Sequence, residues 1–254
     1  MIAKTEKEKE LLREGGALLA SVLQKITKSV RSGIQTGELD EIAKKEIRAA
    51  GGKPSFLNYR TRGTKMPYPA ALCVSVNDEI VHGIPGGRVL KEGDIVGLDI
   101  GMEYKGFFTD MAVTVPVGKV SKDAEKLICV TKKALEIGIG AVRAGARTGD
   151  IGEAIQSYVE SEGLHVVREL VGHGVGKAVH EEPEVPNLGK RGTGPELREG
   201  EVVALEPMIV LGSPRIKVSR DGWVWSTQDG SLSAHFEHTI LVTKKGAKIL
   251  TVAY

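Results

Sequence analysis

The chain has 254 residues, long enough for one large domain or two small ones with a sizeable core. Apolar residues make up 41% and charged residues 27%, as in ordinary globular proteins, and no apolar run approaches the roughly 18 residues of a membrane span. The net charge is only +2, basic residues are interleaved with acidic ones, and aromatic residues make up 4%, which argues against direct nucleic-acid readout.

The N-terminal stretch and the cysteines bear on the compartment. Residues 1–10 are charged where a signal peptide would turn apolar. The two cysteines, Cys73 and Cys129, are too few for a disulfide framework and are interpreted as free thiols. We therefore expect a cytoplasmic protein.

Capping signals and apolar spacing predict four helices. Thr5-x-x-Glu8 is typical of a capping box, and Ser121 is a typical N-cap. Thr36 and Thr148 are the caps expected for the second and fourth helices. The predicted helices run from about 6 to 31, from Thr36 to the glycines at 51–52, from Ser121 to about 142, and from Thr148 to about 162.

Runs of β-forming residues alternate with turns in the rest of the chain. Residues 53–70 are proline-rich and are expected to form a loop. From 166 onward, short β-rich runs alternate with Gly and Pro turns. The better-defined strands are predicted at 72–76, 79–84, 94–104 and 107–117.

The chain also repeats itself, at a distance of about 110 residues, which is too long for a solenoid. Helix capping alone could explain one match, but not three in the same order. The repeat predicts a single domain, 1–254, with halves of about 5–117 and 121–251 related by a pseudo-twofold axis. It makes Asp99 equivalent to Glu206 and His82 equivalent to His180. The matching segments are 31–39 with 143–151, 82–85 with 180–183, and 90–99 with 197–206.

Two acids are expected to face each other across a hairpin. With Tyr104-Lys105 as a two-residue loop, Asp99 and Asp110 become direct cross-strand neighbours. A bulge at Gly106 would shift them apart but keep them within reach. Paired carboxylates on half-buried strands need a cation or a proton between them; the alternative is two solvent-facing acids on an edge strand.

Three further residues carry ligand chemistry. Glu206 ends a β-rich run at Pro207, and Glu237 enters another; each could be an ion-pair partner or a ligand. His173 lies between Gly172 and Gly174, which would let the backbone pass close to a ligand or metal. Together with Asp99 and Asp110 they form an oxygen-rich set with one imidazole, suited to Mn²⁺, Fe²⁺ or Co²⁺ and also able to bind Zn²⁺. Four carboxylates carry enough charge for two such ions.

These residues lie in motifs that resemble those of the type I methionine aminopeptidases. The resemblance extends over nearly the whole chain, and the ordered set is far more specific than any one motif. It implies an α+β, pita-bread fold with two pseudo-twofold halves around a curved, mostly antiparallel sheet with helices outside. The motifs are Asn77–Pro85, Gly93–Asp99, Thr109-Asp110, Gly172–Pro183, Leu205–Met208, Asp221–Trp223 and Ser231–Thr239.

The resemblance also implies the roles of the site residues. Asp110 and Glu237 would bridge two divalent ions, Asp99 would chelate one, and His173 and Glu206 would hold the other. Metal-activated water would attack the methionine carbonyl with Glu206 as general base. His180 would bind the scissile amide, and His82 would contact its nitrogen on the leaving side. These roles are expectations from the resemblance alone.

The same resemblance implies the substrate pocket. The methionine side chain would enter a pocket lined by Tyr68, Cys73 and Trp223, with Tyr59 as a further candidate. The stretch from Tyr59 to Tyr68 is longer than the family's usual pocket loop, which could alter access to the site. Val179 stands where the family often has Phe, which would make the pocket roomier.

The expected substrates are peptides and nascent proteins with an N-terminal methionine and a small second residue. The expected protein is a monomer with possible transient ribosome contact. One alternative is an aminopeptidase or prolidase of the same fold with another N-terminal specificity. A second is a non-catalytic pita-bread protein that binds partners; such relatives generally lose metal ligands, whereas all five are present here.

Overall fold

The computed structural model describes residues 1–61 and 64–253. Its elements alternate between helices and strands in two successive groups. The helices are α1 (Glu6–Ser29), α2 (Thr36–Ala49), α3 (Lys122–Ala141) and α4 (Thr148–Ser161). The strands are β1 (Lys53–Pro54), β2 (Leu72–Val76), β3 (Glu79–Val81), β4 (Ile95–Tyr104), β5 (Phe107–Pro116), β6 (His165–Val166), β7 (Val171–Gly174), β8 (Glu181–Pro186), β9 (Val202–Leu205), β10 (Met208–Val210), β11 (Ile216–Val218), β12 (Trp225–Thr227), β13 (Ser233–His235), β14 (Glu237–Thr243) and β15 (Gly246–Ile249).

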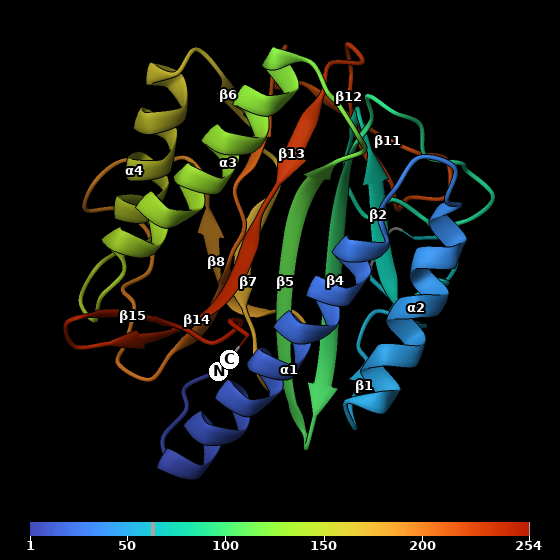
Figure 1. The fold of residues 1–254 in the computed structure, drawn as a ribbon. Coiled ribbons are helices and arrows are strands. Elements are labelled where there is room, and N and C mark those ends of the chain that lie inside the picture. Colours follow the sequence, from blue (N-terminus) through green and yellow to red (C-terminus); the bar gives the residue numbers. More distant parts are fainter. Residues whose placement is uncertain (62–63, 254) are drawn as a thin grey trace.

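A nine-stranded antiparallel sheet forms the centre of the molecule. Its main path is β1-β4-β5-β14-β9-β7-β8, with β2 added to β4 and β15 added to β14. Two three-stranded sheets, β13-β10-β6 and β11-β12-β3, accompany it. Figure 1 shows the four helices on one side of the strands, α1 and α2 beside β2, β4 and β5, and α3 and α4 over the later strands. The α+β class is confirmed.

Side-chain hydrogen bonds fix the first turn of each helix. The capping box at Thr5 and the Ser121 cap are confirmed. The expected caps at Thr36 and Thr148 are wrong by one residue, because both threonines already lie within their helices. The backbone N–H groups of the preceding residues, Gln35 and Arg147, instead donate to carboxylates one turn into each helix, at 2.8 Å in both cases. These carboxylates anchor the first turns of the two helices.

Successive side chains along each strand alternate between the apolar core and the opposite face of the sheet. Leu98 and Ile100 of β4 pack with α1 and α2 in one apolar cluster. A second cluster joins α3 and α4 to β9 and β14. Because successive side chains of a strand point to opposite faces, Asp99 points away from the helices. The uncovered face of the sheet is therefore where a polar site can form.

The hairpin between β4 and β5 differs from the sequence-based expectation. Its two turn residues are Lys105 and Gly106, both with positive φ (50° and 84°), which suits the twist of a tight hairpin. This turn places Asp110 opposite Gly101 and Asp99 opposite Ala112. The two acids are therefore not directly opposed. They are diagonal neighbours on the same face, still close enough to interact.

Two threonine hydroxyls hold the seam between β5 and β14, where the two groups of elements meet. In the ladder between these strands, two residue pairs are opposed: Ala112 with Glu237 and Met111 with His238. Beyond one end, the Thr239 hydroxyl accepts from the Asp110 backbone N–H (2.8 Å) and donates to its carbonyl (2.7 Å). Beyond the other end, the Thr114 hydroxyl makes the same two bonds to the backbone of His235, both at 2.9 Å.

The reciprocal arrangement agrees with the repeat seen in the sequence. Thr114 and Thr239 occupy equivalent places on β5 and β14, and so do Asp110 and His235. Asp99 lies on β4, next to β5, and Glu206 directly follows β9, next to β14. The equivalence of Asp99 and Glu206 is therefore also visible in the strand order.

No helix in the described ranges has both the length and the apolar character needed to cross a membrane.

The seam makes a first prediction about stability. Thr239→Val should lower the free energy of unfolding by about 2–4 kcal/mol, because it leaves a buried N–H and a buried C=O of Asp110 unpaired. Thr239→Ser keeps the hydroxyl and should lose only about 1 kcal/mol for the missing methyl group. Urea unfolding followed by circular dichroism measures both; equal losses in the two variants would contradict the role given to the hydroxyl.

Candidate active site

One cavity of about 570 Å³ opens on the sheet face away from the helices. Acids and histidines form its floor, and an apolar cluster forms one wall. The polar residues that the sequence predicted for the site all line it: His82, Asp99, Asp110, His173, His180, Glu206 and Glu237. The apolar lining includes Phe56, Tyr59, Tyr68, Cys73 and Trp223.

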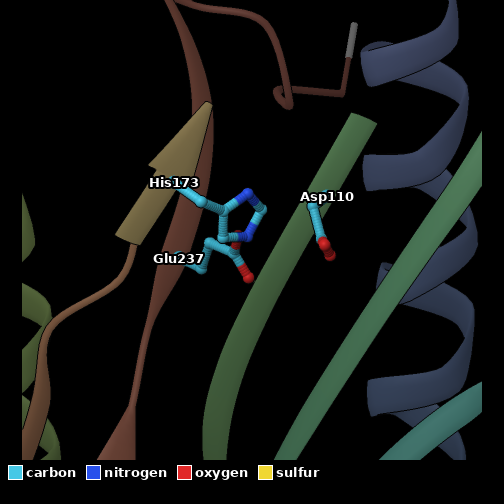
Figure 2. A group of neighbouring side chains, drawn as sticks. All are labelled: Asp110, His173 and Glu237. Carbon is cyan, nitrogen blue, oxygen red and sulfur yellow. The ribbon is translucent and has the colours of Figure 1, made fainter. Parts of the chain in front are cut away.

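Three predicted ligands converge from three strands. Asp110 lies on β5, His173 on β7 and Glu237 at the start of β14, and one donor atom from each lies within 4.8 Å of the others. Figure 2 shows the imidazole and the Glu237 carboxylate close together, with the Asp110 carboxylate on the facing strand. Residues far apart in sequence are thus gathered at the seam.

The other two predicted ligands flank this group. Glu206 Oε1 lies 3.4 Å from His173 Nε2. Asp99 is the diagonal neighbour of Asp110 across the β4–β5 hairpin. All five predicted ligands therefore border one space, although only three form the compact group.

Burial makes the charged forms of these acids costly. It raises the pKa of Asp110 to about 7, with the Glu206 charge adding to the effect, and raises the pKa of Glu206 to about 8. Burial and the neighbouring acids also raise the pKa values of Asp99 and Glu237 well above their usual range. Such a set would bind protons in the absence of a compensating positive charge.

Unpaired oxygens point to the missing positive charge. Within residues 1–61 and 64–253, buried oxygens of Asp99, Asp110 and Glu237 have no hydrogen-bond partner. Buried polar atoms are normally paired, and carboxylate oxygens with an imidazole nitrogen are suitable ligands for divalent ions. The donor set therefore fits a divalent metal site.

The glycines around His173 serve a different purpose from the expected one. A Cβ at Gly172 would collide with the carbonyl oxygen of Ala204 on β9, and one at Gly174 with that of Glu182 on β8. The glycines therefore let β7 pass closely between two neighbouring strands, which brings His173 to the seam. They are explained by strand packing rather than by approach to a metal.

His235 is a site neighbour that the sequence analysis missed. Its side chain is 3% exposed, and its Nε2 lies 3.4 Å from Glu206 Oε2. Burial lowers the pKa of His235 to about 3 and that of His173 also to about 3, so both imidazoles are neutral near pH 7. Glu206 thus lies between two imidazoles, one at each oxygen. The only sequence signal was a histidine two positions before Glu237, which by itself indicates nothing about Glu206.

The apolar wall contains the predicted pocket residues. Tyr68, Cys73 and Trp223 line the cavity and belong to one buried cluster with Phe56, Ala70 and Val179. Val179 packs in this cluster but is not among the described residues that line the cavity. The edge of the Tyr68 ring meets Trp223 at 5.2 Å between centroids. The Tyr68 hydroxyl donates to the Gly83 carbonyl at 2.8 Å, next to His82. The wall is therefore rigidly joined to the polar floor.

Tyr59 and Met66 both contact residues of this wall. Tyr59 and Tyr68 are linked by a backbone hydrogen bond of 2.8 Å, and the Trp223 indole N–H donates to the Met66 carbonyl at 2.9 Å. The Tyr59 hydroxyl lies 2.7 Å from Nδ1 of His180. Part of the predicted long loop, residues 62–63, lies outside the described residues.

His82 is held in an unusual backbone conformation. Its φ is 59°, in the left-handed region that a residue with a side chain seldom adopts. Its ring meets Trp223 edge-on at 6.2 Å. Burial, with the neighbouring His180 and His235, lowers the pKa of His82 to about 4, so it is neutral near pH 7. Strain of this kind is typical of functional sites.

Comparison with known proteins agrees with this geometry. The model of metallopeptidase family M24 matches residues 10–244. Methionine aminopeptidase 1 of Bacillus subtilis is 45% identical over 251 residues, with 99% of each chain covered. The methionine aminopeptidase of Clostridium perfringens is 46% identical over 252 residues, also with 99% of each chain covered.

The chain belongs to the methionine aminopeptidases of metallopeptidase family M24. Structural similarity agrees: the crystal structure of methionine aminopeptidase from Thermotoga maritima superposes with a TM-score of 0.94 at 43% identity, covering 99% of this chain and 100% of that one. The curled antiparallel sheet with helices is the pita-bread fold of this family. The family and the fold expected from the sequence motifs are confirmed.

Prolidases share only the fold with this family member. The prolidase from Pyrococcus furiosus has a TM-score of 0.77 at 19% identity, and the match covers 100% of this chain but 66% of that one. The architecture is thus common to methionine aminopeptidases and prolidases, and substrate choice must come from the site itself.

The buried acids predict how stability depends on pH and metal. Above about pH 7.5 the histidines, whose ordinary pKa is about 6.5, are neutral in both the folded and unfolded states. The buried acids, with pKa values of about 7 and 8, still hold part of the protons that the unfolded chain has released. The unfolded state then binds fewer protons, so stability falls with rising pH. The metal-free protein should lose about 1 kcal/mol between about pH 7.5 and 8.5.

Excess Mn²⁺ should remove this dependence, because carboxylates bound to a cation are ionised throughout that range. Thermal unfolding of chelator-treated and Mn²⁺-supplemented protein across the pH range measures the difference. Identical pH slopes in the two samples would mean that the acids do not form a cation site.

Proposed function

We propose that this chain hydrolytically removes the N-terminal methionine from peptides and nascent proteins, with preference for a small second residue. One observation carries the proposal: four buried acids and an imidazole converge beside an apolar pocket in a chain 45% identical over its length to a methionine aminopeptidase. Buried acids or an apolar pocket alone would also suit proteins of other classes. Their combination in one cavity supports a peptidase that recognises an apolar N-terminal side chain.

The metal would be held by the five converging residues. We propose that Asp99, Asp110, His173, Glu206 and Glu237 bind two divalent ions, of Co, Mn, Fe or Zn. Unpaired buried oxygens on Asp99, Asp110 and Glu237 support this set. Bound ions would polarise the scissile carbonyl and make water a stronger nucleophile near neutral pH.

Glu206 is the proposed general base. Its carboxylate borders the cavity between His173 and His235, with a pKa raised to about 8 by burial. A base whose pKa lies near the working pH both accepts and releases protons readily. Glu206 would take a proton from the attacking water and deliver it to the leaving amine.

The two cavity histidines would act on the peptide bond. His180 carries the Tyr59 hydroxyl on Nδ1, which leaves its other ring nitrogen available to the substrate. It would hydrogen-bond the scissile amide and stabilise the tetrahedral intermediate. His82, fixed by its backbone and by Trp223, would contact the amide nitrogen on the leaving side.

The pocket suits an unbranched apolar side chain. Tyr68, Cys73 and Trp223 line the cavity beside the acids, with Val179 in the same apolar cluster, and a flexible thioether fills such a space readily. Val179 is smaller than an aromatic residue and would leave room for longer side chains. We further propose that the enzyme works as a monomer in the cytoplasm, with transient contact to ribosomes that present its substrates.

Peptide specificity tests this function directly. We expect Met-Ala-Ser to be cleaved with kcat/KM at least about 100-fold above Leu-Ala-Ser, since a pocket that fits one side chain discriminates by about 1–3 kcal/mol per misplaced methylene. The dipeptide Ala-Pro probes prolidase-type activity, Ala-Pro-Ser probes X-Pro aminopeptidase activity, and Met-Trp-Ser probes the second-residue preference. Release of free amino acid is followed by chromatography with Mn²⁺ present.

The outcomes separate the alternatives. Equal cleavage of the Leu and Met peptides would replace the methionine assignment by a broader aminopeptidase. Preferred cleavage before proline would favour a prolidase. No cleavage of any peptide would favour the alternative of a non-catalytic protein that binds partners.

Substitution of the proposed base gives a second test. Glu206→Gln should lower kcat on Met-Ala-Ser by about 10²–10⁴-fold, the usual contribution of general base catalysis, with KM changed less than about threefold. Because Glu206 is also a proposed ligand, Mn²⁺ stoichiometry is measured by calorimetry and the assay is run at saturating Mn²⁺. Glu196→Gln, an exposed acid near Arg147, is the control. Near-normal kcat in Glu206→Gln would rule out the base assignment.

A further inference from the structure

His235 lies directly behind the proposed base. Its side chain is 3% exposed, and its Nε2 faces Glu206 Oε2 at 3.4 Å. Among the residues that the structure describes, this nitrogen has no hydrogen-bond partner, although it is buried. A buried, unpaired imidazole nitrogen 3.4 Å from a carboxylate oxygen needs an explanation.

The backbone of His235 is fixed independently of its ring. The Thr114 hydroxyl bonds both its N–H and its carbonyl, and β13 pairs it with Met208, two residues after Glu206. The imidazole and the carboxylate are therefore carried by adjacent paired segments. Little motion of either backbone is available to change their relation.

The position of His235 has a counterpart in the other half of the sheet. Thr239 holds the Asp110 backbone in the same way that Thr114 holds His235. Asp110 faces Asp99, and His235 faces Glu206, so each pair consists of equivalent positions. At these equivalent positions, one half has two carboxylates, and the other has one carboxylate backed by an imidazole.

We propose that His235 is a positioning residue that donates a hydrogen bond from Nε2–H to Glu206 Oε2. This bond would leave Oε1, which lies beside His173, as the oxygen that faces the cavity. The inference rests on the proposed function only in taking Glu206 as the general base. His235 itself lies behind Glu206 and would not touch the substrate.

The chemistry favours a donor at this place. An ionised carboxylate has two equivalent oxygens and can rotate about the C–C bond that carries it. Either oxygen can then face the water, so the proton-accepting atom is not fixed in place. A fixed N–H donor on one oxygen removes that freedom and supports the charged form. Partners of this kind behind functional groups typically contribute about 10- to 100-fold to metal affinity or activity.

Three variants test the role. His235→Leu removes the donor, and His235→Gln keeps an N–H donor on a side chain of similar reach. His165→Leu, at an exposed histidine on β6, is the control for losing a histidine elsewhere. We expect His235→Leu to lower kcat on Met-Ala-Ser by about 10- to 100-fold with KM changed less than about threefold, and His235→Gln to stay within about threefold of wild type.

Calorimetry with Mn²⁺ on chelator-treated protein gives a readout that does not need turnover. His235→Leu should weaken Mn²⁺ binding by about tenfold, and His235→Gln should restore it. A folded Leu variant, judged by circular dichroism and melting temperature, with wild-type kcat and Mn²⁺ affinity would overturn the proposal. So would a Gln variant as impaired as the Leu variant.

The wild-type protein provides a test that does not depend on any variant folding. Nitrogen-15 NMR of the zinc-loaded enzyme should show the His235 proton on Nε2, assigned by through-bond correlations. A proton on Nδ1 instead would exclude the donation. Failure of Met-Ala-Ser cleavage by the wild type would refute the proposed function but would leave this tautomer result standing.

Discussion

Four acids buried on one face of a sheet are the constraint around which this molecule is arranged. Desolvation raises the pKa of each acid, and repulsion from neighbouring acids adds to it for Asp99, Asp110 and Glu237. Such a cluster forms only where the surrounding fold holds these strands in place despite the cost of burying the charges. The helices supply that restraint by burying the opposite face in two large apolar clusters.

The seam between β5 and β14 shows how the strands are held while they carry these acids. A continuous ladder would place every residue at regular spacing, whereas this ladder ends after two pairs. Threonine hydroxyls then satisfy the backbone groups of Asp110 and His235. The backbone remains paired at a point where the strands diverge, and the space between them becomes the floor of the cavity. Local loss of ladder regularity thus creates the site without leaving buried backbone groups unpaired.

Much of this arrangement was predictable because it depends on patterns along the chain. Apolar spacing located all four helices, and the repeat aligned Asp99 with Glu206. The hairpin register was not predictable in the same way. It depended on whether Lys105 would adopt a positive φ, and lysine has no strong preference for that conformation. With Lys105 and Gly106 in the turn, Asp99 and Asp110 are diagonal neighbours rather than directly opposed.

His235 could not be assigned from the sequence for a related reason. Its importance comes from contact with Glu206, and that contact depends on the pairing of β13 with β10 across a bend at Pro207. The bracing of Trp223 by Met66 likewise joins segments that no local pattern connects. Motifs located the residues that carry charge, while their supporting partners became visible only in three dimensions.

The pseudo-twofold arrangement also explains how two similar halves can contribute different chemistry. At equivalent places, Asp110 brings a second carboxylate to Asp99, and His235 brings an imidazole to Glu206. Two carboxylates can only accept hydrogen bonds when ionised, so their shared space requires a cation or a proton. With the proposed donation from His235, one oxygen of Glu206 would be satisfied, and the other would be available to accept a proton from water. A difference of residue type at one pair of equivalent positions would therefore let Glu206 act as a base within a cation site to which both halves contribute acids.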